Sequence, residues 1–302
     1  MRLLLVHNSG SRLAGRVPRK DLVACLEASG AEVLDVFPDG PDAVPAAIAE
    51  AARVGCDRVV VAGGDGTVHP VLQALPGTGL ALAVVPLGTG NVLAEELGLR
   101  SGDWHAACHV AAAGPALPMD LGLADGHYFA VNFGAGIDAQ VVHDLGVRDK
   151  RTFGRTAFIG QLIRCMGHSA PARFTLTLSL NGEPVASVDV RAWAALVSNT
   201  PRYAWRLYFR PDARPDDGLL DLCVLAPRTR GAFLSNVALN FLVRRPVLST
   251  DTLCRAFTSA RIEADPPVHW QVDGESLGMT PVDVSIVPAA ISVAVPPSRL
   301  RA

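Results

Sequence analysis

Lysine is nearly absent from this chain of 302 residues, which contains only Lys20 and Lys150. The pattern G-x-x-x-x-G-K-[ST], in which a lysine and backbone amides hold phosphates, does not occur, and its absence excludes an ordinary P-loop protein. A phosphate site here must therefore use backbone N–H groups, arginine or a metal ion. Charges of one sign do not gather in a block, and the formal net charge is −2, so no global field attracts nucleic acid.

Cysteine motifs and long apolar runs are also missing. The six cysteines are scattered without a C-x-x-C pair, which argues against a disulfide framework or a zinc ribbon and is typical of a reducing compartment. No stretch reaches the roughly 18 to 20 apolar residues of a membrane span. The apolar run at 3–6 is too short for a secretory signal and is interpreted as a first β-strand. We therefore expect a cytoplasmic protein that meets a membrane peripherally, at its inner face.

The first 120 residues show a regular alternation of strand and helix patterns. Apolar and β-branched runs predict strands at 3–6, 32–37, 58–62 and 80–85, and helical spacing of apolar residues predicts helices at 20–29 and 44–54. Glycine-rich or polar turns follow several of these strands. Such an alternation predicts an α/β domain, in which a parallel sheet has helices on both faces.

After about residue 120 the pattern changes to short alternating segments. These predict strands at 127–132, 173–180, 184–190, 192–197, 220–225 and 282–295, with helices at 155–166 and 231–243. Asn181-Gly182 between two of the strands is a strong hairpin signal. The predicted architecture is thus an N-terminal α/β domain (1–120) followed by a mainly antiparallel β-sandwich domain (121–302).

The clearest chemical signal is Gly63-Gly64-Asp65-Gly66-Thr67, directly after the buried strand at 58–62. Glycines let backbone N–H groups approach a phosphate without obstruction, and a helix that begins near Thr67 offers its positive end to the anion. Asp65 is suited to orient a magnesium ion or to hold a nucleotide by hydrogen bonds. A plain tight turn is the alternative, since Gly-Asp-Gly is common turn chemistry.

Two further strands end in small polar turns. Leu87-Gly88-Thr89-Gly90-Asn91 follows the strand at 80–85, and Asn8-Ser9-Gly10-Ser11 follows the first strand. In an open parallel sheet, ligands bind beyond the carboxyl ends of the strands, so turns at three such ends converge on one crevice. Their joint occurrence favours a phosphate site over three unrelated turns.

On these residues the chain resembles the bacterial diacylglycerol kinases and their relatives, including the sphingosine and ceramide kinases. Gly63–Thr67 and 87–91 are similar to the family's nucleotide loop and second loop, and Asp216–Asp221 and Val272–Glu275 to two further signatures. The resemblance implies an ATP- and Mg²⁺-dependent lipid kinase that transfers the γ-phosphate to a lipid hydroxyl, as in diacylglycerol or a sphingoid base. It also implies an active site in the cleft between the two domains.

The resemblance carries roles to individual residues. It implies nucleotide binding for Asn8, Gly63, Gly64, Asp65, Gly66, Thr67, Gly88, Thr89 and Asn91. It implies catalysis by Asp65, Asp273 and Glu275, with the general base left open between the last two. It implies an accessory magnesium site formed by Asp217 and the backbone carbonyls of Arg214 and Leu219. The tail at 288–302 is expected to pack on the first domain, the lipid substrate is expected at a membrane surface, and a homodimer is left open.

Two departures from the family pattern support alternatives. Ser9 and Arg12 replace a proline and a glycine of the first turn, and His69-Pro70 replaces an Asn-Glu pair, which favours a non-catalytic regulator that binds lipid or nucleotide. An NAD kinase is the other alternative, because that related group shares the Gly-Gly-Asp-Gly loop. The Leu-Gly-Thr-Gly-Asn and Asp-Gly-Glu motifs resemble the lipid group more closely.

Three weaker patterns remain. Gly134–Ala139 loosely resembles a dinucleotide fingerprint and is interpreted as a turn. Asp273-Gly274-Glu275, taken alone, predicts a hairpin between strands at 268–272 and 282–287. The apolar helix at 231–243, followed by Arg244-Arg245, is interpreted as a core helix or, alternatively, as a surface helix that touches anionic lipid.

Overall fold

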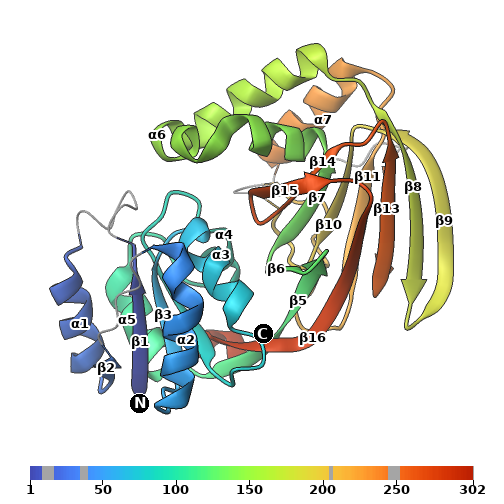
Figure 1. Ribbon diagram of the computed structural model, residues 1–302. Coiled ribbons are helices and arrows are strands. Elements are labelled where there is room, and N and C mark those ends of the chain that lie inside the picture. The colour runs from blue at the N-terminus through green and yellow to red at the C-terminus, as the bar shows by residue number, and fades with distance from the viewer. Residues whose placement is uncertain (9–16, 35–39, 204–206, 244–251, 302) are drawn as a thin grey trace. The chain divides into compact units, whose positions relative to one another are not determined.

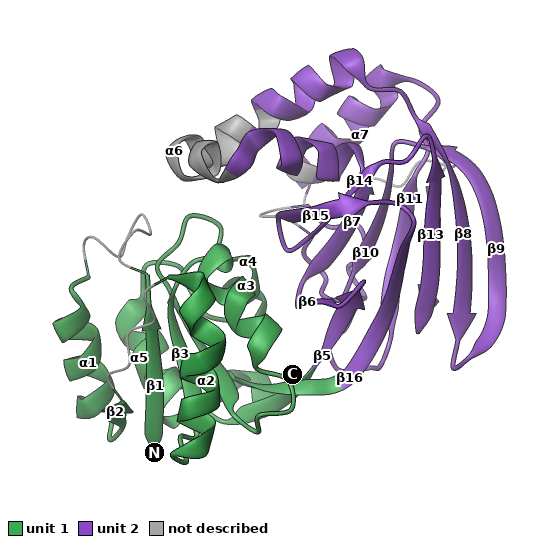
Figure 2. Cartoon of the chain, in the orientation of Figure 1, with its two compact units in different colours: residues 1–119, 289–302 green, residues 120–288 purple. Residues whose placement is uncertain are grey.

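The computed structural model describes residues 1–8, 17–34, 40–203, 207–243 and 252–301. They form two compact units: unit 1 comprises residues 1–119 and 289–302, and unit 2 comprises residues 120–288 (Figure 2). Three predicted features lie outside the described residues, namely the first-turn residues 9–12, the end of the strand at 35–37 and the arginines at 244–245.

Unit 1 is built on a parallel sheet in the order β2-β1-β3-β4 (Figure 1). Its strands are β1 (Arg2–His7), β2 (Glu32–Leu34), β3 (Arg58–Gly63) and β4 (Ala81–Pro86). Every residue of β3 and β4 is buried, which explains why both read as unbroken apolar runs. The register pairs Leu4 with Val59 and Val59 with Leu82, so β1, β3 and β4 end at one edge of the sheet.

Helices cover both faces of this sheet (Figure 1). They are α1 (Arg19–Ala28), α2 (Val44–Arg53), α3 (Asp65–Ala74), the short α4 (Val92–Glu96) and α5 (Trp104–Ala113), with 3-10 turns η2 (Pro41–Ala43) and η3 (Pro297–Arg301). α1 packs with α5, and α2 packs with α3. In α2 the buried residues Ala47, Ile48 and Ala51 recur at helical spacing, which fixes the face that meets the sheet.

Unit 2 contains two layers of antiparallel strands. One layer holds β8 (Ala172–Leu180), β9 (Glu183–Ala192), β13 (Ser259–Asp265) and the start of β16 (Val282–Ala294). The other is a six-stranded sheet in the order β12-β11-β10-β7-β14-β15, formed by β7 (Asn132–Gly136), β10 (Ala194–Ser198), β11 (Leu220–Leu225), β12 (Thr252–Phe257), β14 (His269–Val272) and β15 (Glu275–Met279). Phe133, Phe174, Phe257 and Ile262 are fully buried in one core that both layers share. This packing is a β-sandwich.

Two helices pack against the six-stranded sheet, α6 (Ile137–His168) and α7 (Arg230–Val243) (Figure 1). A second apolar cluster joins them to the sheet and includes Ile137 and Leu162 of α6, Phe233 of α7, and Leu196 and Cys223 of the strands. Among the described helices, none has both the length and the apolar character that a bilayer crossing requires.

Two strands, β5 (Ala116–Ala124) and β16, have residues in both units, and β16 pairs with strands of each. The first residues of β16 pair with β13, with Val282 opposite Ile262, and its last residues pair in parallel with β4, with Val293 beside Leu82. After the strand, the Val295 N–H donates to the Pro115 carbonyl at 3.0 Å. The remaining short strand, β6 (His127–Phe129), pairs with β5, and β5 pairs with β16.

The predicted fold class is confirmed: an α/β unit with a mostly parallel sheet precedes an antiparallel β-sandwich. The hairpin prediction is also confirmed, since Asn181 (φ 52°) and Gly182 (φ 86°) join β8 to β9 in the left-handed conformations of a tight turn. One interpretation was wrong: Gly134–Ala139 is the end of β7 and the start of α6 rather than a turn. The helix predicted at 155–166 is present but begins at Ile137. The hairpin predicted at Asp273-Gly274-Glu275 is also present, but its second strand is β15 rather than β16.

Candidate active site

Three polar turns meet at the carboxyl edge of the sheet in unit 1. The Asn8 N–H donates to the Ala62 carbonyl at 3.2 Å, and the Asn8 side-chain amide donates to the Thr67 hydroxyl at 3.1 Å. The Leu87 N–H donates to the Gly63 carbonyl at 2.8 Å. The turns after β1, β3 and β4 are therefore hydrogen-bonded to one another, as expected for a site at the ends of neighbouring parallel strands.

Two glycines allow the second and third turns to touch. A Cβ atom added to Gly64 would lie 2.9 Å from the Gly88 Cα, and one added to Gly88 would lie 2.4 Å from the Gly64 Cα. Real Cβ atoms do not approach a backbone atom that closely, so both positions require glycine. The result is a surface of bare backbone between the start of α3 and the loop that follows β4.

Asn91 fixes the shape of the loop after β4. It is buried in a left-handed conformation with φ 51°, which asparagine tolerates better than most residues. Its side chain accepts from the Gly88 N–H at 2.9 Å and donates to the Gly88 carbonyl and the Ser101 hydroxyl at 2.9 and 3.0 Å. Thr89, at the tip of this loop, is exposed and is free to meet a ligand.

Asp65 is the first residue of α3 and is partly buried. Its carboxylate accepts from the Leu93 N–H of α4 at 3.4 Å, so it links the starts of two helices. Burial raises the pKa of the Asp65 carboxyl, and hydrogen bonds from the backbone of 91–93 offset part of that rise. The N-terminus of α3 beside it presents backbone N–H groups and the positive end of a helix dipole.

Pro70 lies further inside a helix than the sequence suggested, because α3 begins at Asp65 rather than near Thr67. A proline at this position cannot donate to the carbonyl four residues earlier, which belongs to Gly66. Gly66 is itself exposed. The Gly66 carbonyl therefore receives no helical hydrogen bond from residue 70.

In unit 2, Asp273 and Glu275 flank the turn between β14 and β15. The Asp273 carboxylate accepts three backbone N–H groups, from Ala130 at 2.8 Å, Val131 at 3.0 Å and Asn132 at 2.9 Å. Asp273 itself has φ 46°. This carboxylate thus closes the chain before β7 onto a turn that is more than 140 residues away in sequence. Glu275 is partly exposed at the start of β15.

The predicted accessory metal loop lies directly before β11. The Asp217 carboxylate accepts from the Leu219 N–H at 3.0 Å, and the Arg214 guanidinium pairs with Asp216 at 3.1 Å. The buried Asp120 carboxylate anchors the loop by accepting from the Gly218 N–H at 2.7 Å. Within the described residues, no group of three or more histidine, cysteine, aspartate or glutamate side chains is placed to hold a metal ion.

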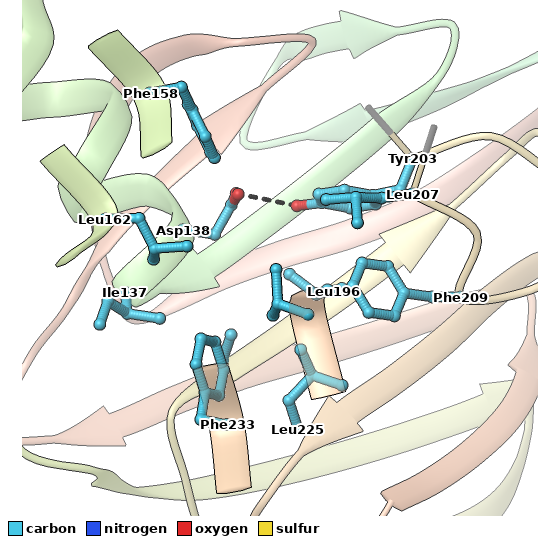
Figure 3. A pocket seen from close by; sticks show the side chains of 12 residues that line it. Ile137, Asp138, Phe158, Leu162, Leu196, Tyr203, Leu207, Phe209, Leu225 and Phe233 are labelled. Atoms are coloured by element: carbon cyan, nitrogen blue, oxygen red, sulfur yellow. Dashed lines mark hydrogen bonds between the residues drawn. The ribbon is translucent and has the colours of Figure 1, made fainter. Parts of the chain in front are cut away.

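Unit 2 also contains an apolar pocket between the six-stranded sheet and the two helices (Figure 3). Its cavity volume is about 40 Å³, and the non-atom space around it, which includes open solvent, is about 390 Å³. The lining comes from α6, α7 and the strands: Ile137, Asp138, Phe158, Leu162, Ala194, Leu196, Tyr203, Leu207, Phe209, Leu225, Phe233 and Val237. Asp138 is the one acidic residue of this lining.

A buried hydrogen-bond network holds Asp138. Its Oδ2 accepts from the Tyr203 hydroxyl at 2.8 Å and from the Gln271 amide at 3.0 Å, and Gln271 also donates to the Asn132 side chain at 3.1 Å. Burial raises the pKa of the Asp138 carboxyl, and the hydrogen bonds from Tyr203 and Gln271 lower it in part. A Cβ atom on Gly134 would lie 2.3 Å from Asp138 Oδ2, so the network also needs a glycine beneath it.

Sequence reasoning missed these residues. Asp138 stands inside the segment that was interpreted as a turn, and Tyr203 and Gln271 lie far from it in sequence. The available signal was an acidic residue in the first turn of an apolar helix, directly after Gly134 and Gly136.

Asp138→Asn is expected to change the pH dependence of stability. Because the folded state raises the pKa of Asp138, it binds this proton more tightly than the unfolded chain does. The contribution to stability is therefore greatest below the unfolded pKa of about 3.9, falls as the pH rises toward the folded value, and then stays constant. Thermal unfolding midpoints measured from pH 4 to 8 should decline less in the variant than in the wild type.

The Asn side chain keeps an oxygen for Tyr203 and Gln271, so Asp138→Asn preserves the network. Asp138→Leu removes the acceptor and should lower the midpoint at every pH, because two buried donors lose their partner. Parallel pH profiles for wild type and Asp138→Asn would contradict the assigned burial of this charge.

Comparisons with known proteins show the family to which the chain belongs. Residues 2–124 match the diacylglycerol kinase catalytic domain, and residues 131–295 match the YegS C-terminal NAD kinase beta sandwich-like domain. A diacylglycerol kinase of Mycobacterium tuberculosis (strain H37Rv) is 31% identical over 277 residues, which are 90% of this chain and 87% of that protein.

A Klebsiella pneumoniae protein named as a probable YegS-like lipid kinase is 36% identical over 74 residues, 24% of this chain and 25% of its own. A crystal structure of a diacylglycerol kinase from Bacillus anthracis (Sterne) covers 98% of this chain and 97% of its own with a TM-score of 0.73; at 19% identity it shows the shared fold. The chain belongs to the diacylglycerol kinase family and is a kinase of the kind that phosphorylates an alcohol group.

Proposed function

We propose that this protein transfers the γ-phosphate of ATP, with Mg²⁺, to the hydroxyl group of a lipid such as diacylglycerol or a sphingoid base. The observation that carries the proposal is the joining of three turns of unit 1 through Asn8, Thr67 and the contact between Gly64 and Gly88. Bare backbone amides beside the start of a helix form a surface suited to a triphosphate.

In this proposal, unit 1 binds ATP, the phosphoryl donor. The N–H groups of Gly64 and Gly66 at the start of α3 are proposed to hold phosphate oxygens, while the Thr67 N–H closes the turn by donating to the Gly64 carbonyl at 2.8 Å. Asn8 and Thr67 hold each other and keep the first two turns in register, while Gly88, Thr89 and Asn91 complete the nucleotide site. Asp65 acts as a positioning residue, because its carboxylate ties the α3 turn to the start of α4.

The oxygen donors of the loop before β11 support the proposal that the protein binds Mg²⁺. Mg²⁺ prefers carboxylate, carbonyl and water oxygens, and Asp217 with the backbone carbonyls of Arg214 and Leu219 offers such a set. Asp217 is exposed, and one of its oxygens accepts a hydrogen bond from the backbone of its own loop, which orients the carboxylate. We propose that these residues hold the accessory ion. A magnesium ion bound with ATP supplies the neutralisation of charge on the transferring phosphoryl group.

For the general base we favour Glu275 over Asp273. A carboxylate offers about four lone-pair positions, and three of those on Asp273 accept backbone N–H groups. Asp273 is thereby assigned to hold the turn in place. Glu275, two residues later, is partly exposed, and we propose that it accepts the proton of the attacking hydroxyl.

The apolar pocket of unit 2 favours an acceptor with a hydrocarbon body. Its walls are aliphatic and aromatic, while Asp138 and Tyr203 supply a polar end. On α7, Leu239, Leu242 and Val243 are exposed at 44%, 76% and 46%, which suits contact with a membrane surface from which a lipid is drawn. We propose peripheral association with the cytoplasmic face of the membrane on this basis.

Phosphate transfer to lipid tests the proposal. The protein should transfer labelled γ-phosphate from ATP to at least one lipid among diacylglycerol, a sphingoid base, ceramide and phosphatidylglycerol, and chelation of Mg²⁺ should abolish the transfer. Mass spectrometry of the extracted lipids identifies the product. Phosphorylation of NAD in place of any lipid would favour the NAD kinase alternative, and ATP binding without turnover would favour a regulator.

A pair of variants on α7 distinguishes the contribution of the pocket to acceptor binding from that of the helix surface. Val237→Trp introduces a large ring at a half-buried pocket position and should raise KM for long-chain acceptors with little change in the Kd of ATP. Ser235→Trp is the matched control, because Ser235 is exposed on the same helix, does not line the pocket and is not among the residues proposed to meet the membrane. Equal kinetics in the two variants would remove the pocket from the proposal.

A further inference from the structure

The structure brings four of the six cysteines into two pairs that the sequence does not reveal. Cys223 of β11 stands directly opposite Cys254 of β12 in the antiparallel register, although 31 positions separate them in the chain. In unit 1, the Cys25 and Cys108 thiols of α1 and α5 interact through a hydrogen bond. All four thiols are free.

The geometry of the first pair allows a covalent bond. Directly opposed residues of antiparallel strands have Cα atoms about 4.5 or 5.5 Å apart, and both spacings lie within the span of about 4.4–6.8 Å that a disulfide needs. Both side chains belong to the apolar layer beneath α6 and α7, and they share a hydrogen bond. The two thiols therefore lie on the same face of the sheet, within hydrogen-bond reach of each other.

We propose that Cys223 and Cys254 form a redox-active thiol pair, in which a peroxide or a low-molecular-weight disulfide converts the two thiols into a disulfide that ties β12 to β11. Cys254 is the attacking thiol, because it is partly exposed on the edge strand, whereas Cys223 is fully buried behind it.

The surroundings of the pair support this division of roles. Arg210 hydrogen-bonds the Cys254 thiol and is itself held by the buried Asp221 in an ion pair of 2.6 Å. The hydrogen bond from Cys223, followed by the Arg210 guanidinium, lowers the pKa of Cys254 to about 7. The shared hydrogen bond and burial raise the pKa of Cys223. The lowered pKa makes Cys254 the more readily ionised thiol of the two.

The chemistry balances with hydrogen peroxide as the oxidant. The Cys254 thiolate attacks one peroxide oxygen, the O–O bond breaks, and a sulfenic acid and hydroxide form. The Cys223 sulfur then attacks the sulfenic sulfur, the S–S bond forms and the S–O bond breaks; the departing hydroxide takes the thiol proton. Two thiols and one peroxide give one disulfide and two water molecules, and a dithiol reductant reverses the oxidation.

Oxidation of the pair is expected to affect the wall of the apolar pocket. Cys223 lies in the same apolar cluster as Leu196, Tyr203 and Phe233, all of which line the pocket. A disulfide would also take the Cys254 thiol away from Arg210. The proposed oxidation does not depend on the identity of the lipid substrate, because it involves only the two thiols and an oxidant.

Peptide mass mapping of the reduced full chain tests the proposal. After exposure to hydrogen peroxide at pH 7 and digestion without reductant, the peptides of Cys223 and Cys254 should be joined, with a mass lower by two hydrogen atoms, and dithiothreitol should separate them. The Cys25–Cys108 pair is the internal control and should oxidise roughly tenfold more slowly, because burial and the neighbouring thiol raise the pKa of Cys108. Oxidation of the control pair first, or oxidation of Cys254 with no link to Cys223, would overturn the proposal.

Two further measurements guard against a fold defect in variants. Alkylation of wild-type Cys254 by iodoacetamide should reach half its maximal rate near pH 7, the pKa that its hydrogen bonds produce, and a midpoint in the ordinary thiol range would overturn the assigned role. Cys223→Ser should leave Cys254 as a mixed disulfide after treatment with oxidised glutathione, whereas the wild type should release the glutathione as Cys223 closes the bond. Stable glutathionylation of both proteins would count against the pair.

Discussion

Glu275→Gln is expected to lower kcat for phosphate transfer by roughly 10²–10⁴ and to leave the thermal unfolding midpoint unchanged. The amide cannot accept the proton of the attacking hydroxyl, while its size and position are those of the native side chain. Steady-state transfer from ATP to the preferred lipid measures the first effect, and calorimetry measures the second. Glu263→Gln is the matched control, because Glu263 is exposed on β13 of the same unit.

Asp273→Asn should give the opposite signature. The native carboxylate accepts the N–H groups of Val131 and Asn132 at Oδ1 and that of Ala130 at Oδ2. An amide places a donor where at least one of these N–H groups needs an acceptor, at a cost of about 1–3 kcal/mol. The midpoint should fall, and activity should fall with it. A loss of activity at full stability in Asp273→Asn, together with an active Glu275→Gln, would reverse the assignment of the base.

Gly88→Ala is expected to weaken ATP binding by roughly tenfold to a hundredfold. The new Cβ would lie 2.4 Å from the Gly64 Cα and 2.7 Å from Asn91 Oδ1, so the two turns must separate. Forced separation of packed groups typically costs about 1–3 kcal/mol, and 1.4 kcal/mol corresponds to a factor of ten in Kd. Gly64→Ala should have the same effect to a smaller extent, since its Cβ would lie at 2.9 Å. Isothermal titration of ATP into each variant measures the change.

Gly231→Ala controls for the substitution itself. Gly231 lies in α7, and nothing stands within 4 Å of the position of its missing Cβ. Alanine is favoured over glycine in a helix by roughly 0.5–1 kcal/mol, so this variant should be as stable as the wild type or more so and should bind ATP normally. Wild-type affinity in Gly88→Ala would show that the turns do not hold the nucleotide together.

The fold was largely predictable because its main signals are local. β3 and β4 read as buried apolar runs, and the Asn181-Gly182 turn needs two left-handed residues that this dipeptide supplies readily. The meeting of the three polar turns was predictable for a related reason. Strands of a parallel sheet end at the same edge, so polar turns at three strand ends had to be neighbours.

The features that escaped prediction depend on contacts between distant segments. Gly134 and Gly136 suggested a turn, but each glycine meets a different need. Gly134 makes room for the Asp138 network. Gly136 has φ 102°, and a Cβ atom there would lie 2.4 Å from the Trp193 carbonyl oxygen. No local pattern could show that the backbone before β7 occupies the Asp273 carboxylate. The Cys223–Cys254 pair likewise needed the register of β12, a strand that the sequence pattern did not predict.

The dual membership of β16 has a consequence for biosynthesis. Residues 289–301 complete unit 1 beside β4, yet the ribosome makes them after the whole of unit 2. Domains usually fold in the order of their synthesis, but the parallel sheet of unit 1 cannot gain its last strand until unit 2 has been translated. Loss of residues 289–301 would therefore destabilise unit 1, although most of that unit is synthesised first. Residues 1–119 expressed alone would expose the unpaired edge of β4, which is prone to aggregation.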